Sequence, residues 1–514
     1  MHHPSKPKRT MHLLLAIAFC IVVLSACIPI SPTNIIRTPT PTPGPFYFLA
    51  GGGSCVKFGY HPQPPYENIQ VSHDTYLAHS EPMVVEDSQN PLHLVGGSKF
   101  FTNLAHYQFQ IGYYVSFDGG CTWTDGGVLP GFGDSVRVSD PSFAFGLNND
   151  VYAGVLYETH KRESGIAVSA STDGGKTFGP AITVFATKEN QIFNDKPWIT
   201  VDRTEGPHRG TIYVVWSYDH NNHCGSGGNC EQNLGFSRST DVGKTFSPAR
   251  LVEGRALFCT NVVPGFPAHS TQCDGVLGAT PVVEPDGTLA VAFAYEDLTY
   301  RSRRTLMVVT TSPDGGNTWT SPVLAATIHD ILGRFRHEKY RNVSLPAFAC
   351  DQKTGQLYLA WSNKGSTDAD IQFATSKDRG QTWSTPIRVN DDPLQDGANH
   401  FQPQLAVAPN GVVSVSFFDT RVDPQHQLID VYLAQSIDQG VSFLKNMRVT
   451  TQSWDPAVGA PTDLDGHQFI GDYQGLSADD HFVHPFWNDT RTGAQEIFTA
   501  ALPSVQPMGV SRDK

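Results

Sequence analysis

Two segments in the second half of the chain carry the same run of reactive side chains. Residues 417–421 (Phe-Phe-Asp-Thr-Arg) and residues 486–491 (Phe-Trp-Asn-Asp-Thr-Arg) each end an apolar stretch with an acid and an arginine. At this spacing the two can form an ion pair, and the planar guanidinium group can also hold the carboxylate of a ligand. We interpret each pair as an ion pair first and as a ligand contact second. The two pairs are Asp419 with Arg421 and Asp489 with Arg491.

Other polar residues stand at comparable positions, where apolar stretches begin or end. Two of them, Asp195 and Asp472, are candidates for the paired carboxylates with which most glycoside hydrolases act. The separation of the two carboxyl groups in the folded chain decides how such a pair works. Hydrophilic loop ends are the simpler explanation for most of the others. These others are Glu81, Asp140, Glu158, Asp219, Asp297, His400 and Gln402.

A short phrase that recurs six times indicates which elements position these residues. Each copy has a serine, an aspartate two residues later, a glycine two residues after that, a hydroxyl residue and a final aromatic ring. Successive copies start between 55 and 73 residues apart. A period of this size, with turns and no helical pattern, predicts the blades of a β-propeller. The copies are residues 116–123, 171–178, 239–246, 312–319, 376–383 and 436–443.

The residue types of the phrase predict a structural role. Aspartate can accept hydrogen bonds from nearby backbone N–H groups, glycine can adopt a positive φ, and the aromatic ring can pack on a neighbouring sheet. All of this is typical of a turn between two strands. A catalytic role would require six active sites around one ring, so we predict that the phrase supports the fold.

The phrase resembles the Asp-box, or BNR repeat, of sialidases and related β-propellers. The resemblance extends over most of the chain after residue 65, and it implies a turn between the third and fourth strands of each blade, away from the ligand face. We therefore predict an all-β fold, a β-propeller spanning residues 66–503 with four-stranded antiparallel blades and a short tail over 504–514.

The blade count follows from the apolar stretches around the phrases. Residues 346–351, 355–363, 370–378 and 386–390 are the four expected strands of one blade. After the last phrase, the chain up to residue 502 provides three more strands and no fourth. Residues 67–74 have the pattern of an isolated fourth strand, and pairing the two ends would close the ring. We predict seven blades, with six as the alternative.

The resemblance to sialidases also implies a set of site residues. Sialidase chemistry uses three arginines that bind the substrate carboxylate, a tyrosine nucleophile assisted by a glutamate, and an aspartate as acid and base. Tyr473, in Gly-Asp-Tyr-Gln-Gly-Leu, resembles the tyrosine motif at the start of the last blade, and Glu296 is the candidate for the assisting glutamate. The three guanidinium groups would come from Arg341, Arg421 and Arg491.

Two features depart from the sialidase pattern. The Arg-Ile-Pro signature of the first blade is absent, and the matching stretch, residues 79–85, contains no arginine. Arg421 and Arg491 also stand at second-strand ends instead of the places that the arginines of sialidases usually occupy.

Because one fold hosts many functions, two hypotheses stay open. One is a sialidase-type glycoside hydrolase, which converging arginines around Tyr473 would favour. The other is a non-catalytic propeller that binds glycans or proteins, which acids and aromatic rings without such arginines would favour.

The N-terminal region predicts export and anchoring. A basic start and an apolar run, too short for a comfortable membrane span, lead to Leu24-Ser25-Ala26-Cys27, which resembles the lipobox of bacterial lipoproteins. We expect residues 1–27 to be a signal peptide and Cys27 to carry a lipid anchor, with an ordinary signal peptide or an uncleaved anchor as the alternatives. Residues 28–65, rich in Thr-Pro, predict a semi-rigid tether. The body would lie outside the cytoplasm at the membrane.

Composition limits partners and cofactors. A net charge of −13 argues against nucleic acid as a partner. No nucleotide, flavin or haem motif is present, and no cysteine spacing resembles a zinc site. Asp463-Leu-Asp465-Gly466 matches a fragment of a calcium loop, and we interpret it as a turn. We predict no cofactor or metal, a carbohydrate or glycoprotein ligand, and a monomer.

The cysteines predict disulfides, because an exported chain meets an oxidising environment. Cys224 and Cys230 bracket a flexible Gly/Ser loop, and Cys259 and Cys273 bracket a Pro/Gly-rich excursion. We expect each of these two pairs to be bonded. Cys55 with Cys121 is a weaker pairing, and Cys350 in an apolar strand is expected to be buried and free.

Overall fold

The computed structural model describes residues 65–188, 192–220, 231–252, 254–259, 273, 275–297, 304–331, 333, 335, 338, 340–463 and 466–506. Every regular element in these residues is a β-strand. The predicted signal peptide, with Cys27, and nearly all of the predicted tether lie outside the described residues.

The strands form sheets of consecutive antiparallel neighbours. Four sheets have four strands each, a fifth has five, and β2 to β9 form one eight-stranded sheet. Within that large sheet a single parallel pair, Phe109 with Arg137, links β4 to β6. The eight strands are β2 (Leu77–Asp87), β3 (Asn90–Asn103), β4 (Gln108–Ser116), β5 (Thr124–Val128), β6 (Ser135–Phe145), β7 (Val151–Thr159), β8 (Ser164–Ser171) and β9 (Ile182–Thr187).

The remaining sheets follow in chain order. They are β10 (Ile192–Val201), β11 (Ile212–His220), β12 (Glu231–Ser239) and β13 (Arg250–Val252); β14 (Val276–Val283), β15 (Leu289–Asp297), β16 (Arg304–Ser312) and β17 (Val323–Ile328); β18 (Ala347–Cys350), β19 (Leu357–Lys364), β20 (Ala369–Ser376) and β21 (Ile387–Arg388); and β22 (His400–Val407), β23 (Val413–Asp419), β24 (Asp430–Ser436) and β25 (Met447–Arg448). The last combines β26 (Gly475–Ala478), β27 (Phe482–Asp489), β28 (Glu496–Thr499) and β29 (Leu502–Pro503) with β1 (Ile69–Gln70).

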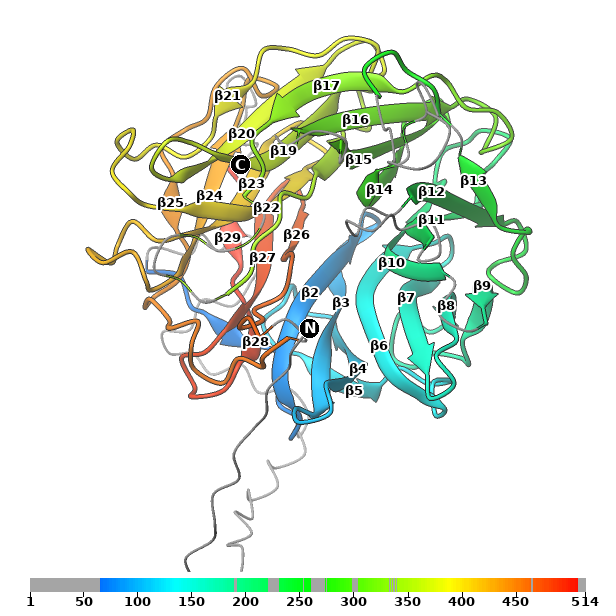
Figure 1. The fold of residues 1–514 in the computed structure, drawn as a ribbon, viewed down its shortest axis with the longest axis horizontal. Coiled ribbons are helices and arrows are strands. Elements are labelled where there is room, and N and C mark those ends of the chain that lie inside the picture. The colour runs from blue at the N-terminus through cyan, green and yellow to red at the C-terminus, as the bar shows by residue number, and fades with distance from the viewer. Residues whose placement is uncertain are drawn as a thin grey trace, which may run out of the picture. The chain divides into compact units, whose positions relative to one another are not determined.

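The inner strands contact one another in a closed series. β2 contacts β6, β6 contacts β10, and the series continues through β14, β18, β22 and β26 back to β2. Figure 1 shows the sheets arranged around a common centre, with the blue β2 next to the orange-red β26 and β27. Sheets in a closed ring, each built of consecutive antiparallel strands, are the arrangement of a β-propeller.

Apolar side chains fill the space between neighbouring sheets. Between the β14–β17 sheet and the β18–β21 sheet, for example, Ala292 and Val309 pack with Leu359 and Trp361 in one buried cluster. The second strands, such as β23 and β27, therefore bury both faces, which explains why they read as nearly continuous apolar runs. The strands that the sequence predicts for residues 346–390 correspond to β18, β19, β20 and β21.

Each recurring phrase forms the same turn between a third and a fourth strand. In the turn between β16 and β17, Ser312 Oγ donates to Asp314 Oδ1 (2.9 Å), and Gly316 N donates to Ser312 Oγ (2.7 Å). Thr318 donates from N to Oδ1 (2.8 Å) and from Oγ1 to Oδ2 (2.7 Å) of the same aspartate. The same four bonds recur in the other five copies.

The glycine of the phrase is required by geometry as well as by conformation. Gly316 has a φ of +90°, which disfavours residues with a side chain. A Cβ atom there would also lie 2.1 Å from the ring of Phe236 in the neighbouring sheet. The turn thus holds the sheets at a close distance, which is a structural role.

An N-terminal strand completes the last sheet, as the sequence predicts. Ile69 and Gln70 of β1 pair with Thr499 and Phe498 of β28. Val71 N extends the pairing with a bond of 2.7 Å to the carbonyl oxygen of Ile497. The two ends of the described chain therefore share one sheet, which removes an exposed edge.

Candidate functional site

Four inner strands contain the same irregularity, and each turns a polar side chain out of the regular pleat. The pairing of β2, β6, β10 and β22 with the next strand shifts at a bulge, immediately before a proline. The bulged residues are Glu81 (φ 52°), Asp140 (φ 52°), Lys196 (φ 49°) and Gln402 (φ 49°). A positive φ in a residue with a side chain costs about 1–3 kcal/mol, and bulges of this kind are frequent next to active sites. β14 has the equivalent bulge with Gly278 (φ 64°).

The bulges bring charged groups from distant parts of the chain together around Asp472. Lys196 Nζ lies 2.8 Å from Asp472 Oδ2 and 3.3 Å from Asp140 Oδ1. Arg341 holds the same carboxylate in a bidentate contact, from Nε to Oδ1 (3.1 Å) and from Nη2 to Oδ2 (2.7 Å). Lys196, Asp140 and Asp472 are each less than a tenth exposed. The carboxylate of Asp472 is thus clamped between two cations.

A second buried pair adjoins this group. Lys99 Nζ lies 2.7 Å from Glu81 Oε2, which also accepts a hydrogen bond from Ser139 Oγ (3.2 Å). The ammonium group of Lys99 sits 4.0 Å from the ring centroid of Phe469 and 4.9 Å from that of Phe109. Charge pairing and cation–π contact together compensate the burial of this lysine.

Burial and neighbouring charges shift the pKa values of the carboxyl groups of the cluster in opposite directions. Burial would raise the pKa of Asp472, but Arg341 and Lys196 outweigh it and hold that pKa well below its usual range. Burial is the larger influence at Asp195, Asp140 and Glu81, and raises their pKa values. One carboxylate is therefore kept charged while its neighbours are shifted toward the neutral acid.

Tyr473 lies in the cluster but in surroundings that oppose its ionisation. Its ring packs edge-on against Trp198, with centroids 5.6 Å apart, and Lys196 Nζ lies 5.8 Å from its ring centre. Burial raises the pKa of Tyr473 far above its usual value, and the neighbouring carboxylates, Asp140 first among them, raise it further. The phenol is therefore held neutral.

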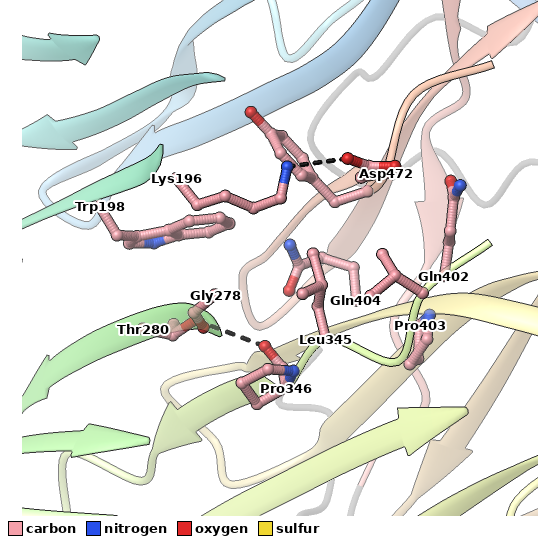
Figure 2. A pocket seen from close by; sticks show the side chains of 12 residues that line it. Lys196, Trp198, Gly278, Thr280, Leu345, Pro346, Gln402, Pro403, Gln404 and Asp472 are labelled. Atoms are coloured by element: carbon pink, nitrogen blue, oxygen red, sulfur yellow. Dashed lines mark hydrogen bonds and ion pairs between the residues drawn. The ribbon is translucent and has the colours of Figure 1, made fainter. Parts of the chain in front are cut away.

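A pocket opens beside this cluster, with a polar wall and an apolar wall. Figure 2 shows Lys196, Asp472 and Gln402 on one side and Leu345 and Pro346 on another, with the Trp198 ring next to Lys196. Its space is about 400 Å³ including solvent at the mouth, and the enclosed part has room for about one water molecule. Any larger ligand would therefore bind across the mouth. Of the residues that line the pocket, Trp198, Val343 and Leu345 are partly exposed. Asp195 and Arg341 are also partly exposed and contact the lining residues Lys196 and Asp472.

Three glutamines line or support the pocket. Gln402 Nε2 donates to the carbonyl oxygen of Gly471 (2.7 Å), and Gln474 Nε2 donates to that of Gln402 (3.1 Å). Both ends of the Gln404 amide have a partner: Nε2 donates to the carbonyl oxygen of Gln474 (3.0 Å), and Oε1 accepts a hydrogen bond from Leu405 N (3.0 Å). The Oε1 atoms of Gln402 and Gln474 are buried and have no hydrogen-bond partner within the described part of the chain.

The structure brings Asp195, Arg341, Asp472 and Tyr473 together, as members of one cluster. Arg421 and Arg491 make their contacts elsewhere. Arg421 pairs with Asp419 (2.7 Å) and with Asp391 (2.6 Å) and covers the ring of Tyr432 at 4.3 Å.

The second repeated arginine is engaged in the same way. Arg491 pairs with Asp489 (2.5 Å) and also donates to Asn68 Oδ1 (2.8 Å) and Thr451 Oγ1 (3.0 Å). In both segments the first interpretation, an ion pair, matches the geometry. None of the contacts found for these two arginines in the described residues involves Arg341, Lys196 or Tyr473.

Glu296 lies at the end of a second strand. It is opposite Thr305 in β16, and its N–H donates to Gly275 (2.9 Å), three residues before the bulge at Gly278. It is only partly buried and does not line the pocket.

Three residues of the cluster escaped the sequence analysis, namely Lys99, Lys196 and Trp198. A signal for Lys196 was present. The dipeptides Glu81-Pro82, Asp140-Pro141, Lys196-Pro197 and Gln402-Pro403 recur at the same place in four inner strands. A proline inside an apolar strand indicates a bulge or an edge, and its preceding residue marks the side chain that the bulge redirects. Nothing comparable marks Lys99.

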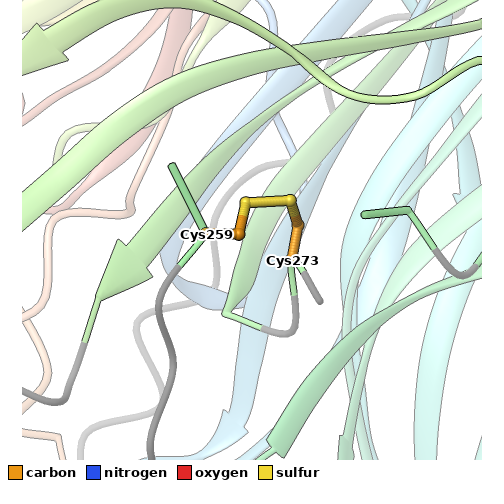
Figure 3. Close-up of a disulfide and its surroundings, with 2 residues drawn as sticks. All are labelled: Cys259 and Cys273. Atoms are coloured by element: carbon orange, nitrogen blue, oxygen red, sulfur yellow. A yellow bond between two sulfur atoms is a disulfide. The ribbon is translucent and has the colours of Figure 1, made fainter. Parts of the chain in front are cut away.

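One predicted disulfide lies within the described residues. Cys259 and Cys273 are bonded, with Cα atoms 5.0 Å apart (Figure 3). Cys121 is also disulfide-bonded, and Cys55, its predicted partner, lies outside the described residues. So do Cys224, Cys230 and Asp465. Cys350 is free and buried.

Within the described ranges, no three or more His, Cys, Asp or Glu side chains are grouped in a way that would hold a metal ion. No helix long and apolar enough to cross a membrane occurs in that part of the chain either. Asp463 accepts a hydrogen bond from His467 N (2.8 Å), and its carbonyl oxygen accepts one from Gly466 N (3.1 Å), as in a turn.

Comparison with known proteins gives structural likenesses only. The sequence matches no protein-family model and no curated protein. Among solved structures, a protein of unknown function from Dyadobacter fermentans is 15% identical, covering 73% of this chain and 97% of its own, with a TM-score of 0.49. The Hadza microbial sialidase Hz136 is 16% identical over 77% of this chain and 73% of its own (TM-score 0.44). The GH93 alpha-L-arabinofuranosidase of Fusarium graminearum is 14% identical over 85% of this chain and 98% of its own, with a TM-score of 0.43.

Proposed function

We propose that this protein is a carbohydrate-binding β-propeller whose ligand lies across the mouth of the central pocket. The observation that carries the proposal is the set of four strained bulges, which gather Glu81, Asp140, Lys196 and Gln402 around Asp472. Strain of this kind persists only where the surrounding structure enforces it, and it concentrates at functional sites.

The chemistry of the mouth supports a sugar. Trp198 offers an aromatic surface that is partly exposed, and Arg341 has a side chain that is 36% exposed. Sugar rings present C–H bonds on their faces and hydroxyl groups on their rims, and a pocket with an aromatic side and a few fixed polar groups suits both. The resemblance of the six turns to those of sialidases favours the same class of ligand.

Binding to immobilised glycans, followed by titration calorimetry, tests this proposal on the full-length protein. We expect Trp198→Ala to weaken glycan binding by about tenfold, the equivalent of one aromatic contact. Phe117→Ala is the matched control, because Phe117 is an exposed ring in a repeat turn and does not line the pocket. No binding to any glycan, or binding that Trp198→Ala leaves unchanged, would refute the proposal.

Glycoside hydrolysis is a second candidate function, and one specific observation favours it. Burial raises the pKa of Asp195, a partly exposed acid next to Lys196 in the chain, while Asp472 is held as the carboxylate by Arg341 and Lys196. Two carboxyl groups whose pKa values are pushed in opposite directions are what acid and base roles require. Asp195 would then protonate the leaving-group oxygen as the glycosidic bond breaks, and the clamped Asp472 would stabilise positive charge on the sugar. A water molecule would attack the sugar carbon and return a proton to Asp195.

Release of 4-methylumbelliferone from neutral glycosides and from the α-sialoside distinguishes the two candidates. If the protein hydrolyses a glycoside and the Asp195→Asn variant does not, hydrolysis through this acid is supported. Turnover of the sialoside that Tyr473→Phe abolishes supports the sialidase route with Tyr473 as nucleophile, despite surroundings that keep its phenol neutral. Absence of turnover with every glycoside, together with glycan binding, leaves recognition as the function.

We further propose a seven-bladed propeller over residues 66–503, acting as a monomer held outside the cytoplasm by a lipid on Cys27. The closed series of inner strands and the pairing of β1 with β28 support the blade count. Fractionation of cells that express the chain tests the anchor. Cys27→Ala is expected to move the protein from the membrane fraction to the soluble fraction, and an unchanged distribution would exclude the lipid.

A further inference from the structure

The cations of the central cluster are already neutralised. Lys99, Lys196 and Arg341 each lie within 2.7 to 2.8 Å of a carboxylate oxygen. The carboxylate partners are Glu81 for Lys99 and Asp472 for both other cations, and Asp472 occupies two nitrogen atoms of Arg341. A ligand carboxylate would therefore have to displace Asp472 from the arginine.

Carboxyl groups outnumber cations at this site. Besides Glu81 and Asp472, Asp140 lies 3.3 Å from Lys196 and Asp463 lies 3.8 Å from Arg341. Asp195, the neighbour of Lys196 in the chain, accepts a hydrogen bond from Lys196 N (3.0 Å), and its charge helps to raise the pKa of Lys196. A further negative charge in these largely buried surroundings meets repulsion and finds no unpaired cation among the described residues of the cluster, and juxtaposed like charges are strongly disfavoured.

The pocket also offers an acceptor that lacks a donor. Gln402 lines the pocket, is 3% exposed, and its Oε1 has no partner in the described part of the structure. Its amide orientation is determined by the bond from Nε2 to Gly471 O (2.7 Å), so the oxygen is the end that stays unsatisfied. A buried acceptor without a donor is costly, and a ligand hydroxyl, directly or through a water molecule, would satisfy it.

We propose that the pocket is selective for uncharged sugars and discriminates against sugars that carry a carboxylate, such as sialic and uronic acids. This inference rests on the proposed carbohydrate-binding function and narrows it. Asp472 acts as the discriminating residue: it neutralises Arg341 and Lys196, which would otherwise attract an acidic sugar. The aromatic ring of Trp198 and the oxygen of Gln402, which has no hydrogen-bond donor among the described residues, favour a neutral sugar rich in hydroxyl groups.

An array of oligosaccharides printed in matched forms, neutral, sialylated and uronic acid-containing, tests the selectivity of the full-length protein. We expect each acidic form to bind at least about tenfold more weakly than its neutral counterpart, which is a modest share of the repulsion expected at a buried site. Equal or stronger binding of the acidic forms would overturn the selectivity and leave carbohydrate binding intact. Absence of binding to every form would refute both.

The Asp472→Asn variant tests the residue assigned to the discrimination. It removes the carboxylate that Arg341 and Lys196 share, so the ratio of acidic to neutral binding is expected to rise about tenfold, and an unchanged ratio would overturn the assignment. If the Asp472 variant does not fold, Asp140→Asn replaces it in the test. This change removes the second carboxylate that contacts Lys196, so the ratio of acidic to neutral binding is again expected to rise. Asp286→Asn is the control with the same change in charge, since Asp286 pairs with Arg379 outside the pocket and should leave the ratio unaltered.

Discussion

At the scale of single residues, the electrostatic energy of the site depends most on the ion pairs of Asp472. A buried carboxylate is costly unless it is paired, and here two cations supply three contacts of 3.1 Å or less. The same contacts leave the carboxylate little capacity to act as a nucleophile. Its role is electrostatic: it neutralises Lys196 and Arg341 and keeps a permanent negative charge next to Tyr473.

Replacement of Asp472 by asparagine should destabilise the protein at neutral pH, by about 2 kcal/mol, because it leaves the buried Lys196 and the partly exposed Arg341 without their shared partner. The pKa of Asp472 is lowered in the folded state, so its stabilising contribution is present above the unfolded value, about 3.9, and is lost as the pH falls below it. Urea unfolding of both proteins should therefore show a difference that shrinks in acid. A difference independent of pH would contradict the ion-pair account.

At the scale of elements, the repeat turn is a self-contained unit. Its aspartate accepts three hydrogen bonds from the turn, and these bonds hold the pKa of Asp241, for example, at about 2. The four bonds recur in all six copies, although the neighbouring residues differ. The local sequence is therefore sufficient for the turn, and its glycine and aromatic ring connect it to the next sheet.

Asp314→Ala tests the contribution of one such turn. It removes three hydrogen bonds from an exposed site, so we expect a loss of about 1–2 kcal/mol in the free energy of unfolding, without a change in glycan binding. Asp134→Ala, an exposed aspartate outside the turns, is the control and should have little effect. Loss of glycan binding in the Asp314 variant would mean that the turns contribute to the site.

At the scale of the whole ring, stability depends on the seam between the two ends of the described chain. Besides the pairing of β1 with β28, Ser72 Oγ donates to Glu496 Oε2 (2.6 Å) and accepts a bond from Ile497 N (2.9 Å). Glu86 of β2 also faces His484 of β27 at 3.5 Å. These contacts join elements that are more than 390 residues apart in sequence.

Ser72→Ala should loosen this seam. It removes two buried hydrogen bonds, so we expect a loss of about 1–3 kcal/mol and faster hydrogen exchange in β1 and β28 than in the other strands. Ser88→Ala, at an exposed serine, serves as the control. Uniformly faster exchange over all sheets would show that the seam does not open on its own.

Glu86 makes the seam sensitive to pH. Burial raises its pKa to about 7, against the opposing bond from His484. The folded protein therefore binds this proton more tightly than the unfolded chain, and stability falls as the pH rises from about 4.5 to about 7, by up to about 3 kcal/mol. Glu86→Gln should remove this decline and stabilise the protein in mildly alkaline buffer. A thermal midpoint that declines equally in both proteins would refute the assignment.

The amino-acid sequence by itself determined the repeat turns, the succession of strands and the pairing of residues 69–70 with the last sheet. These features depend on local hydrogen bonding and on a regular period, both of which are visible in a linear chain. It also marked Asp195 and Asp472 as candidate site residues, from their places before or within predicted first strands, and Arg341 and Tyr473, from the resemblance to sialidases.

Only the tertiary structure decided what these residues do. Asp140, Lys196, Arg341 and Asp472 meet because the ring brings the starts of separate strands to one centre, and no local pattern encodes which charges will face each other there. The same holds for Arg421, which pairs with Asp391, thirty residues earlier in the chain. Charge pairing at the centre of a ring is a property of the closed fold, since Asp140 and Lys196 lie in different sheets and Arg341 and Asp472 lie in segments between strands.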